Sequence, residues 1–202
     1  MTRFYAMKTN NNSIDSIVTQ QVIGIIGEIA AGKTTVTKYL EEKYGAVTYR
    51  FSDMLRDILA RLYLENRRHN MQTLSTCLRQ NFGDDLMSKV IVADVKKSKE
   101  RIIITEGIRR PSDAVYLREL PNFHIISVTS DIKLRHQRLG ERRENPDDST
   151  TTWEQFVRQN NQESEQKIKE IASQADFTLD NNGSLENLYR ELDKIICGLI
   201  GV

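Results

Sequence analysis

Short apolar runs alternate with stretches of helical character along most of this chain. The runs predicted as strands are QVIGII, AVTYRF, RIIIT, FHIISV and DFTLD. The stretches predicted as helices after them are residues 34–44, 53–64, 112–120, 131–139 and 184–197. Strands that alternate with helices in this way are typical of a parallel sheet covered on both faces, so the pattern predicts an α/β fold.

Two segments depart from this alternation. Residues 1–20 are polar and rich in asparagine without a clear period, and we predict a flexible tail outside the fold. The rest of the chain, residues 21–202, has a length suited to one domain. Between the second and third strands, residues 53–98 read as two or three helices, and an insertion of that size usually carries specificity.

The stretch GEIAAGKTT lies between the first predicted strand and a helix. Gly27, four residues, Gly32, Lys33 and Thr34 have the spacing of a phosphate-binding loop. The glycines let backbone amides approach a phosphate, Lys33 can reach β and γ phosphates, and the Thr34 hydroxyl can bind Mg²⁺. A plain glycine-rich turn is the alternative, but the flanking strand and helix favour the phosphate loop. The loop residues predicted to line the site are Gly27, Glu28, Ala30, Ala31, Gly32, Lys33, Thr34 and Thr35.

Polar residues follow the second strand, at the edge of an open α/β sheet where ligands collect. Ser52 or Asp53 can cap the next helix, and Arg56 falls one turn later on the same side. The sequence leaves two interpretations open, an anion-binding arginine and a solvated arginine on a capped surface helix.

The third strand ends in TEGIRRP. Glu106 stands at the carboxyl end of the strand, where a carboxylate beside a phosphate loop normally holds Mg²⁺ directly or through water. Arg109 and Arg110 follow, and next to a phosphate loop we favour bidentate anion contacts over a solvated turn.

A basic run follows the fourth strand. Arg135, Arg138 and Arg142 repeat at three and four residues and therefore share one helix face, where like charges repel unless an anion joins them. We predict an arginine-rich lid over residues 135–150, with Gly140 in its hinge, that stabilises charge in phosphoryl transfer. A solvated helix face is the alternative.

Charge and composition exclude several classes of function. Basic and acidic side chains number 29 and 28, so no global field indicates nucleic acid or an anionic membrane as a partner. No apolar run approaches the roughly 20 residues of a membrane span, and the first residues lack a signal-peptide core, so we expect a cytoplasmic protein. Cys77 and Cys197 have no cysteine or histidine cluster near them, and we predict buried thiols rather than a disulfide or zinc site.

Together these residues resemble P-loop kinases of the nucleoside monophosphate kinase and dephospho-coenzyme A kinase types, over about residues 21–197. GEIAAGKTTV and ADFTLDNNGSLENL are similar to dephospho-coenzyme A kinase segments. SDMLR is similar to the adenylate kinase segment whose arginine holds the acceptor phosphate, here Arg56. TEGIRRPSD looks like the DGIR-type segment of nucleotide kinases, which implies an acceptor role for Arg109. Glu106 departs from the usual aspartate, and the PLL-type sequence of dephospho-coenzyme A kinases is missing.

The resemblance implies a three-layer P-loop kinase fold with a five-stranded parallel sheet in the order 2-3-1-4-5 and helices on both faces. It also implies a helical acceptor-binding insertion, a short arginine-rich lid, and ATP with Mg²⁺ as cofactors. The turn after the fifth strand, with Asn182 and Gly183, either faces the adenine or is a plain turn.

Three functional hypotheses follow. The leading one is a kinase that moves the γ-phosphoryl group of ATP to a small nucleotide-like acceptor, a nucleoside or deoxynucleoside monophosphate. The second phosphorylates the ribose hydroxyl of dephospho-coenzyme A and requires a general base, for which Asp53 is the best candidate. The third is a regulatory NTPase that binds a protein through residues 53–98. We expect a monomer or a homodimer.

The hypotheses assign roles to particular residues. The predicted catalytic residues are Lys33, Asp53, Arg138 and Arg142. The predicted substrate-binding residues are Ser52, Asp53, Arg56, Arg79, Glu106 and Arg109. The predicted metal ligands are Thr34 and Glu106.

Overall fold

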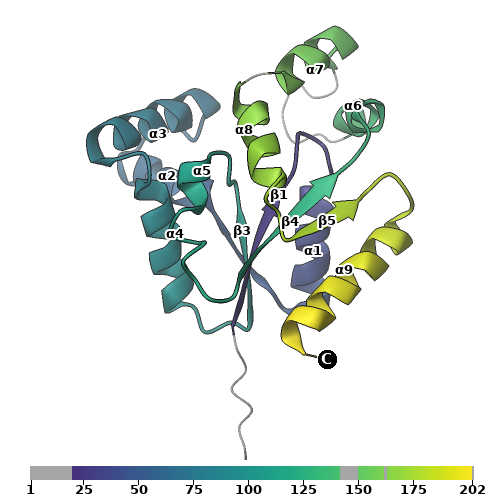
Figure 1. The fold of residues 1–202 in the computed structure, drawn as a ribbon. Coiled ribbons are helices and arrows are strands. Elements are labelled where there is room, and N and C mark those ends of the chain that lie inside the picture. The colour runs from purple at the N-terminus through teal and green to yellow at the C-terminus, as the bar shows by residue number, and fades with distance from the viewer. Residues whose placement is uncertain (1–19, 142–149, 162, 202) are drawn as a thin grey trace, which may run out of the picture.

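The computed structural model describes residues 20–141, 150–161 and 163–201. The predicted tail and the predicted lid lie partly outside these ranges. The described residues form one parallel sheet of five strands in the order β2-β3-β1-β4-β5, which confirms the predicted order (Figure 1). The strands are β1 (Gln21–Ile26), β2 (Val47–Arg50), β3 (Ile102–Glu106), β4 (Phe123–Thr129) and β5 (Phe177–Asp180).

Helices cover both faces of this sheet. Side chains alternate between the two faces along each strand, so a strand can pack against both helical layers. The helices are α1 (Lys33–Tyr44), α2 (Phe51–Arg61), α3 (Arg68–Phe82), α4 (Leu86–Lys97), α5 (Pro111–Ala114), α6 (Ile132–Glu141), α7 (Trp153–Asn160), α8 (Glu163–Ala172) and α9 (Leu185–Ile200). From β1, Ile23 and Ile25 pack with α1 and α9, whereas Val22 and Ile26 pack with α2 and α4. A strand buried on both faces reads as a continuous apolar run, as QVIGII does.

The predicted insertion consists of α2, α3 and α4. α2 begins at Phe51, earlier than predicted, because the Phe51 side chain is buried in the core instead of extending β2. α3 has no buried residue, and Figure 1 shows it beyond the carboxyl ends of the strands. Cys77 lies on this helix and is exposed, so the prediction of a buried thiol there is wrong.

The helix predicted over residues 112–120 is shorter than expected. α5 ends at Ala114, and turns follow up to Leu120. Pro121 disfavours helical geometry only at Leu120, so it does not explain why α5 ends already at Ala114.

The helices after β4 lie at the opposite side of the strand ends from α3, as Figure 1 shows for α6 and α7. Thr152 caps α7, since its hydroxyl accepts a hydrogen bond from the backbone N–H of Gln155. Among the described residues, no helix is both long and apolar enough to cross a membrane.

Candidate active site

The phosphate-loop sequence forms a tight turn between β1 and α1. A side-chain Cβ at Gly27 would lie 2.5 Å from the backbone oxygen of Val128, so only glycine fits there. Ala30 has φ of 58° and Gly32 has φ of 107°, both in the left-handed region. α1 begins directly after Gly32, and the first N–H groups of a helix have no partner within it. The loop therefore ends in a group of backbone donors, which suits an anion.

Lys33 lies across this loop. Its ammonium group donates hydrogen bonds to the carbonyl oxygens of Gly27 at 2.7 Å and Glu28 at 2.9 Å. Thr34 is exposed in the first turn of α1, and Thr35 is half-buried beside it. Their phosphate and metal contacts stay predictions, but both Lys33 and Thr34 lie where the loop meets the helix.

Glu106 is the last residue of β3, and its carboxylate contacts side chains from both β2 and α1. Parallel pairing sets Arg50 opposite Glu106, and the Arg50 Nε donates to one Glu106 oxygen at 2.9 Å. The other oxygen accepts a hydrogen bond from the Thr37 hydroxyl on α1. Thr37 falls one turn after Thr34, so the carboxylate reaches the helix face that carries the predicted magnesium ligand. Sequence reasoning missed Arg50 and Thr37, because strand register brings Arg50 to Glu106 and the packing of α1 on the sheet brings Thr37 there.

Three residues predicted to bind substrate meet at the start of α2. The Arg56 Nη1 lies 2.9 Å from the Ser52 hydroxyl oxygen and 2.8 Å from a carboxylate oxygen of Asp53. The other Asp53 oxygen accepts the backbone N–H of Arg50 at 3.2 Å. Asp53 therefore stabilises the N-terminus of α2 from the first turn of the helix. The Arg56 side chain is 43% exposed, which leaves its guanidinium open to an anion.

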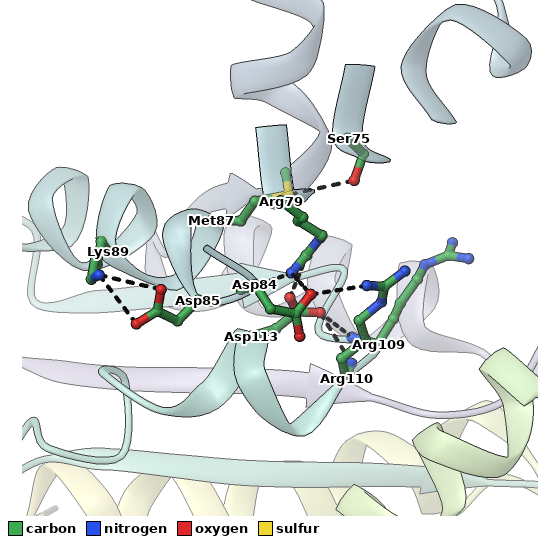
Figure 2. Close-up of polar contacts among 9 residues, drawn as sticks. All are labelled: Ser75, Arg79, Asp84, Asp85, Met87, Lys89, Arg109, Arg110 and Asp113. Carbon is green, nitrogen blue, oxygen red and sulfur yellow. Dashed lines mark hydrogen bonds and ion pairs between the residues drawn. The ribbon is translucent and has the colours of Figure 1, made fainter. Parts of the chain in front are cut away.

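Arg79 joins α3 to α5 (Figure 2). Its Nη2 lies 2.6 Å from Asp113, which is 2% exposed, and its Nη1 also contacts Asp84. The second Asp113 oxygen accepts the backbone N–H groups of Arg109 and Arg110 at 2.9 and 3.0 Å. The role of Arg79 in substrate binding stays a prediction, and in this structure its guanidinium ties the insertion to the loop that carries Arg109.

The two adjacent arginines of that loop differ. Arg110 pairs with Asp84 at 3.1 Å, whereas the Arg109 side chain extends away from these carboxylates (Figure 2). Arg109 is exposed, and its guanidinium has no hydrogen bond or ion pair within the described ranges. Of the two, Arg109 is therefore the one open to an anionic ligand.

Arg135 is buried and does not lie on an open anion-binding face of the kind predicted for it. It is 3% exposed, and its guanidinium is surrounded by acceptors. These are the backbone oxygens of Ser130 at 3.1 Å and Ile29 at 3.2 Å, the Asn160 amide oxygen at 2.9 Å and the Glu28 carboxylate at 3.2 Å. The ring of Phe156 packs 5.7 Å from the guanidinium carbon. Arg135 thus joins the phosphate loop to α7, and its guanidinium is occupied by these contacts.

Arg138 remains half-buried on the same helix, with its Nη1 3.2 Å from the Ser130 hydroxyl oxygen. Arg142 lies outside the described residues.

The Glu28 carboxylate of the phosphate loop faces two cations, since the Lys169 ammonium lies 3.5 Å from it and the Arg135 guanidinium 3.2 Å. Glu28, predicted as a nucleotide contact, therefore also connects the loop to α6 and α8.

The turn after β5 contacts both the phosphate loop and the loop before α6. Asn182 is exposed, and its amide oxygen accepts the backbone N–H of Asp131 at 2.7 Å. Gly183 is exposed next to it, and Ser184 caps α9. Asn181 is buried and donates to the Ala31 carbonyl oxygen at 2.8 Å. Sequence reasoning missed Asn181, although the polar run DNNG directly after a strand was a signal.

Comparison with known proteins agrees with this geometry. The AAA_17 family model, described as an AAA domain, matches residues 26–154. A UPF0200 protein of Methanococcus maripaludis is 28% identical over 184 residues, which cover 90% of this chain and 99% of the relative. A UPF0200 protein of Methanocaldococcus jannaschii is 29% identical over 178 residues, or 87% of this chain and 88% of the relative.

Solved structures resemble the chain in fold. The shikimate kinase of Bacteroides thetaiotaomicron has a TM-score of 0.59 at 12% identity, with 90% of this chain and 99% of that chain covered. Identity at that level shows the fold alone, which is that of the P-loop kinases. Because the AAA domain model also covers well over half of the residues, the chain belongs to the AAA domain family of P-loop NTPases and has a kinase-like fold.

Proposed function

We propose that this protein is an ATP-dependent kinase that transfers the γ-phosphoryl group to a nucleoside or deoxynucleoside monophosphate. The strand order is the observation that supports this most. β1, which leads into the phosphate loop, lies at the centre of the sheet. Arg56 and Arg109 follow β2 and β3 on one side of it, and Arg138 follows β4 on the other. Carboxyl ends of parallel strands meet at one edge, so cations flank the loop on both sides.

The donor half fits ATP with Mg²⁺. The backbone donors at the start of α1 and the Lys33 ammonium suit the phosphates. The Thr34 hydroxyl and the Glu106 carboxylate are oxygen groups of the kind that Mg²⁺ prefers, and Thr37 holds Glu106 against α1. When bound, Mg²⁺ would neutralise charge on the phosphates.

The acceptor half fits a second phosphate. Arg56 and Arg109 are exposed guanidinium groups, and such groups bind phosphate through paired hydrogen bonds. Asp53 and Ser52 hold Arg56 in place from one turn away. A monophosphate has a second pKa near 6 and is mostly dianionic at neutral pH, so it needs no general base. Arg138 and Arg142 would then neutralise charge that develops between donor and acceptor.

The ribose hydroxyl of dephospho-coenzyme A is the alternative acceptor. A hydroxyl must lose its proton, and Asp53 is the best candidate to take it. In this structure one Asp53 oxygen contacts Arg56 at 2.8 Å and the other accepts the Arg50 N–H. This arrangement favours Asp53 as the partner of Arg56 over Asp53 as a base.

A regulatory NTPase that acts on a protein is the second alternative, and one surface favours it. Four exposed apolar side chains belong to the insertion or its first loop, namely Leu62, Tyr63, Leu64 and Phe82. Tyr63 is 90% exposed next to Leu62 and Leu64 in the chain, and exposed apolar groups that lie together often mark protein contacts.

An acceptor screen that measures ADP release tests these hypotheses. The panel contains ribo- and deoxyribonucleoside monophosphates, dephospho-coenzyme A and a reaction without acceptor, and the Lys33→Ala variant is the matched control. We expect release with at least one monophosphate and none from the variant. Release with dephospho-coenzyme A alone would overturn the proposal. Slow hydrolysis that responds to a protein and to no small acceptor would support the regulatory NTPase instead.

A further inference from the structure

We propose that Asn181 is a positioning residue that fixes the conformation of the phosphate loop and so determines its affinity for nucleotide. The proposal rests on nucleotide binding at the loop, which is part of the proposed function, and does not depend on the identity of the acceptor.

Asn181 lies directly after β5 and is 3% exposed. Its backbone N–H donates to Thr129 at 2.9 Å, and its backbone oxygen accepts the Ser130 hydroxyl at 3.3 Å. These contacts hold the residue against the end of β4. Its side-chain Nδ2 then donates to the Ala31 carbonyl oxygen at 2.8 Å, across 150 positions of sequence. The amide therefore joins the rigid sheet to the last turn of the loop.

The hydrogen bond to Ala31 determines where the next donor points. A trans peptide is planar, so the Ala31 carbonyl and the Gly32 N–H point in opposite directions. Because the carbonyl is directed towards Asn181, the Gly32 N–H directly before α1 is directed away from Asn181. Loss of the Asn181 amide would leave this peptide free to rotate and would leave a carbonyl oxygen without its donor.

Gly32 and Asn181 also fit each other sterically. A Cβ at Gly32 would lie 2.1 Å from the Asn181 Nδ2, closer than any side chain tolerates. The second glycine of the loop is thus required here by the amide as well as by its φ of 107° and by the approach of a phosphate. The Asn181 Oδ1 has no hydrogen-bond partner within the described part of the chain, so the bond from Nδ2 to Ala31 is what fixes the buried amide.

Nucleotide affinity gives the first test. The dissociation constant of the β,γ-imido analogue of ATP with Mg²⁺ is measured for Asn181→Ala, for the isosteric Asn181→Asp, and for Asn187→Ala as a control. Asn187 is an exposed asparagine on α9. We expect both Asn181 variants to bind roughly 10-fold more weakly, as loss of a buried hydrogen bond predicts, and Asn187→Ala to bind like the wild type. A merely structural role would lower the melting temperature of Asn181→Ala and leave its affinity unchanged, and that result would overturn the proposal.

A double-mutant cycle gives a second test that needs no nucleotide. Gly32→Ala is introduced into the wild type and into Asn181→Ala, and the melting temperature of each protein is measured. The strain that a side chain meets at the positive φ of Gly32 is the same in both backgrounds, whereas the clash with the Asn181 Nδ2 exists only in the wild-type background. We expect a smaller drop in the Asn181→Ala background, and equal drops would overturn the steric role of Asn181. Wild-type protein that binds no nucleotide would instead overturn the proposed function, while the melting temperatures would still report on Asn181.

Discussion

Two arginines on opposite sides of the phosphate loop illustrate how the two halves of this molecule differ. Arg135, on the proposed donor side, is 3% exposed and contacts a carboxylate, an amide and two backbone carbonyls. Arg109, on the proposed acceptor side, is exposed and extends away from the nearby carboxylates (Figure 2). The donor-side arginine is part of the scaffold that shapes the loop, whereas the acceptor-side arginine is open to a ligand.

The supporting structure differs in the same way. α1 and α9 contribute fully buried side chains such as Leu40 and Leu192 to the core beside the phosphate loop. α3 contributes no fully buried side chain; its Leu74 and Leu78 pack half-buried against the core, and Arg79 contacts Asp113 and Asp84. The helices beside the phosphate loop are therefore fixed by full apolar burial, whereas α3 combines partial apolar packing with charged pairs.

The largest effect is expected in the donor half, from Lys33→Ala. We predict that turnover falls by about 10³-fold or more, because the lysine positions the transferred phosphate. The fold should persist, since Lys33 is half-buried at the start of α1 and belongs to none of the core clusters. Steady-state kinetics with circular dichroism measures both, and near-normal activity with normal ATP affinity would exclude the kinase hypothesis.

The lid arginines should show the next largest effect. Arg138→Ala or Arg142→Ala is predicted to lower kcat by something on the order of 10²–10³ with little change in stability, if these side chains act chiefly in the transition state. Lys133→Ala, an exposed cation on the same helix as Arg138, is the control. If kcat is unchanged in both arginine variants, the basic run is a solvated face.

Arg135 tests the scaffold side of the comparison. Arg135→Met should lower the free energy of unfolding by about 2–3 kcal/mol, because Glu28 and several backbone acceptors lose their cation. Urea denaturation measures this, and Lys133→Met on the same helix is the matched control. If Arg135→Met lowers kcat and leaves stability unchanged, Arg135 belongs with the predicted lid arginines and is not part of the scaffold.

Arg56 tests the ligand side. We expect Arg56→Ala to raise the acceptor KM by about 10–100-fold through loss of an anion contact, without loss of stability. Asp53→Asn should lower kcat only several-fold if the acceptor is a monophosphate, since Asp53 then positions Arg56 and takes no proton. With a hydroxyl acceptor, Asp53→Asn should instead lower kcat by roughly 10²–10⁴. The two variants are compared with the best acceptor from the screen.

The smallest effect concerns pH and the packing of α9 on α1. Burial raises the pKa of Asp193, but hydrogen bonds from Lys43, Tyr44 and Tyr39 outweigh it and lower that pKa below its usual value. Because the pKa of Asp193 is lower in the folded state, ionised Asp193 stabilises the fold at pH values above its unfolded pKa, near 4. This stabilisation is lost as the pH falls through the folded pKa.

We therefore expect Asp193→Asn to lower the melting temperature by about 2–4 °C at pH 7. The difference from the wild type should shrink as the pH falls below about 4. Melting curves across this range measure it, with Glu191→Asn, an exposed position on the same helix, as the control. A difference that grows on acidification would contradict the assigned pairing.

The elements and the loop could be predicted because their signals are local. The spacing of Gly27, Gly32, Lys33 and Thr34 fixes a turn within a few residues, and the apolar runs mark the strands. The convergence of Ser52, Asp53 and Arg56 was also predictable, because helix periodicity sets it. The short α5 was not, because Pro121 signals a helix end only near Leu120 and not at Ala114.

The partners of the charged groups required the tertiary structure. Helix periodicity gives Arg135 and Arg138 the same face, and only the packing of α7 against the phosphate loop buries the first and leaves the second half-buried. Likewise, strand register brings Arg50 to Glu106.

The sequence by itself determined the phosphate loop, the alternating strands and the arginines that follow them, because each depends on residues that are close along the chain. Only the tertiary structure decided which arginines are buried and which are open to a ligand. Those choices depend on contacts across 106 positions from Arg135 to Ile29 and 150 positions from Asn181 to Ala31. No local pattern contains such contacts, because the folded sheet alone brings these residues together.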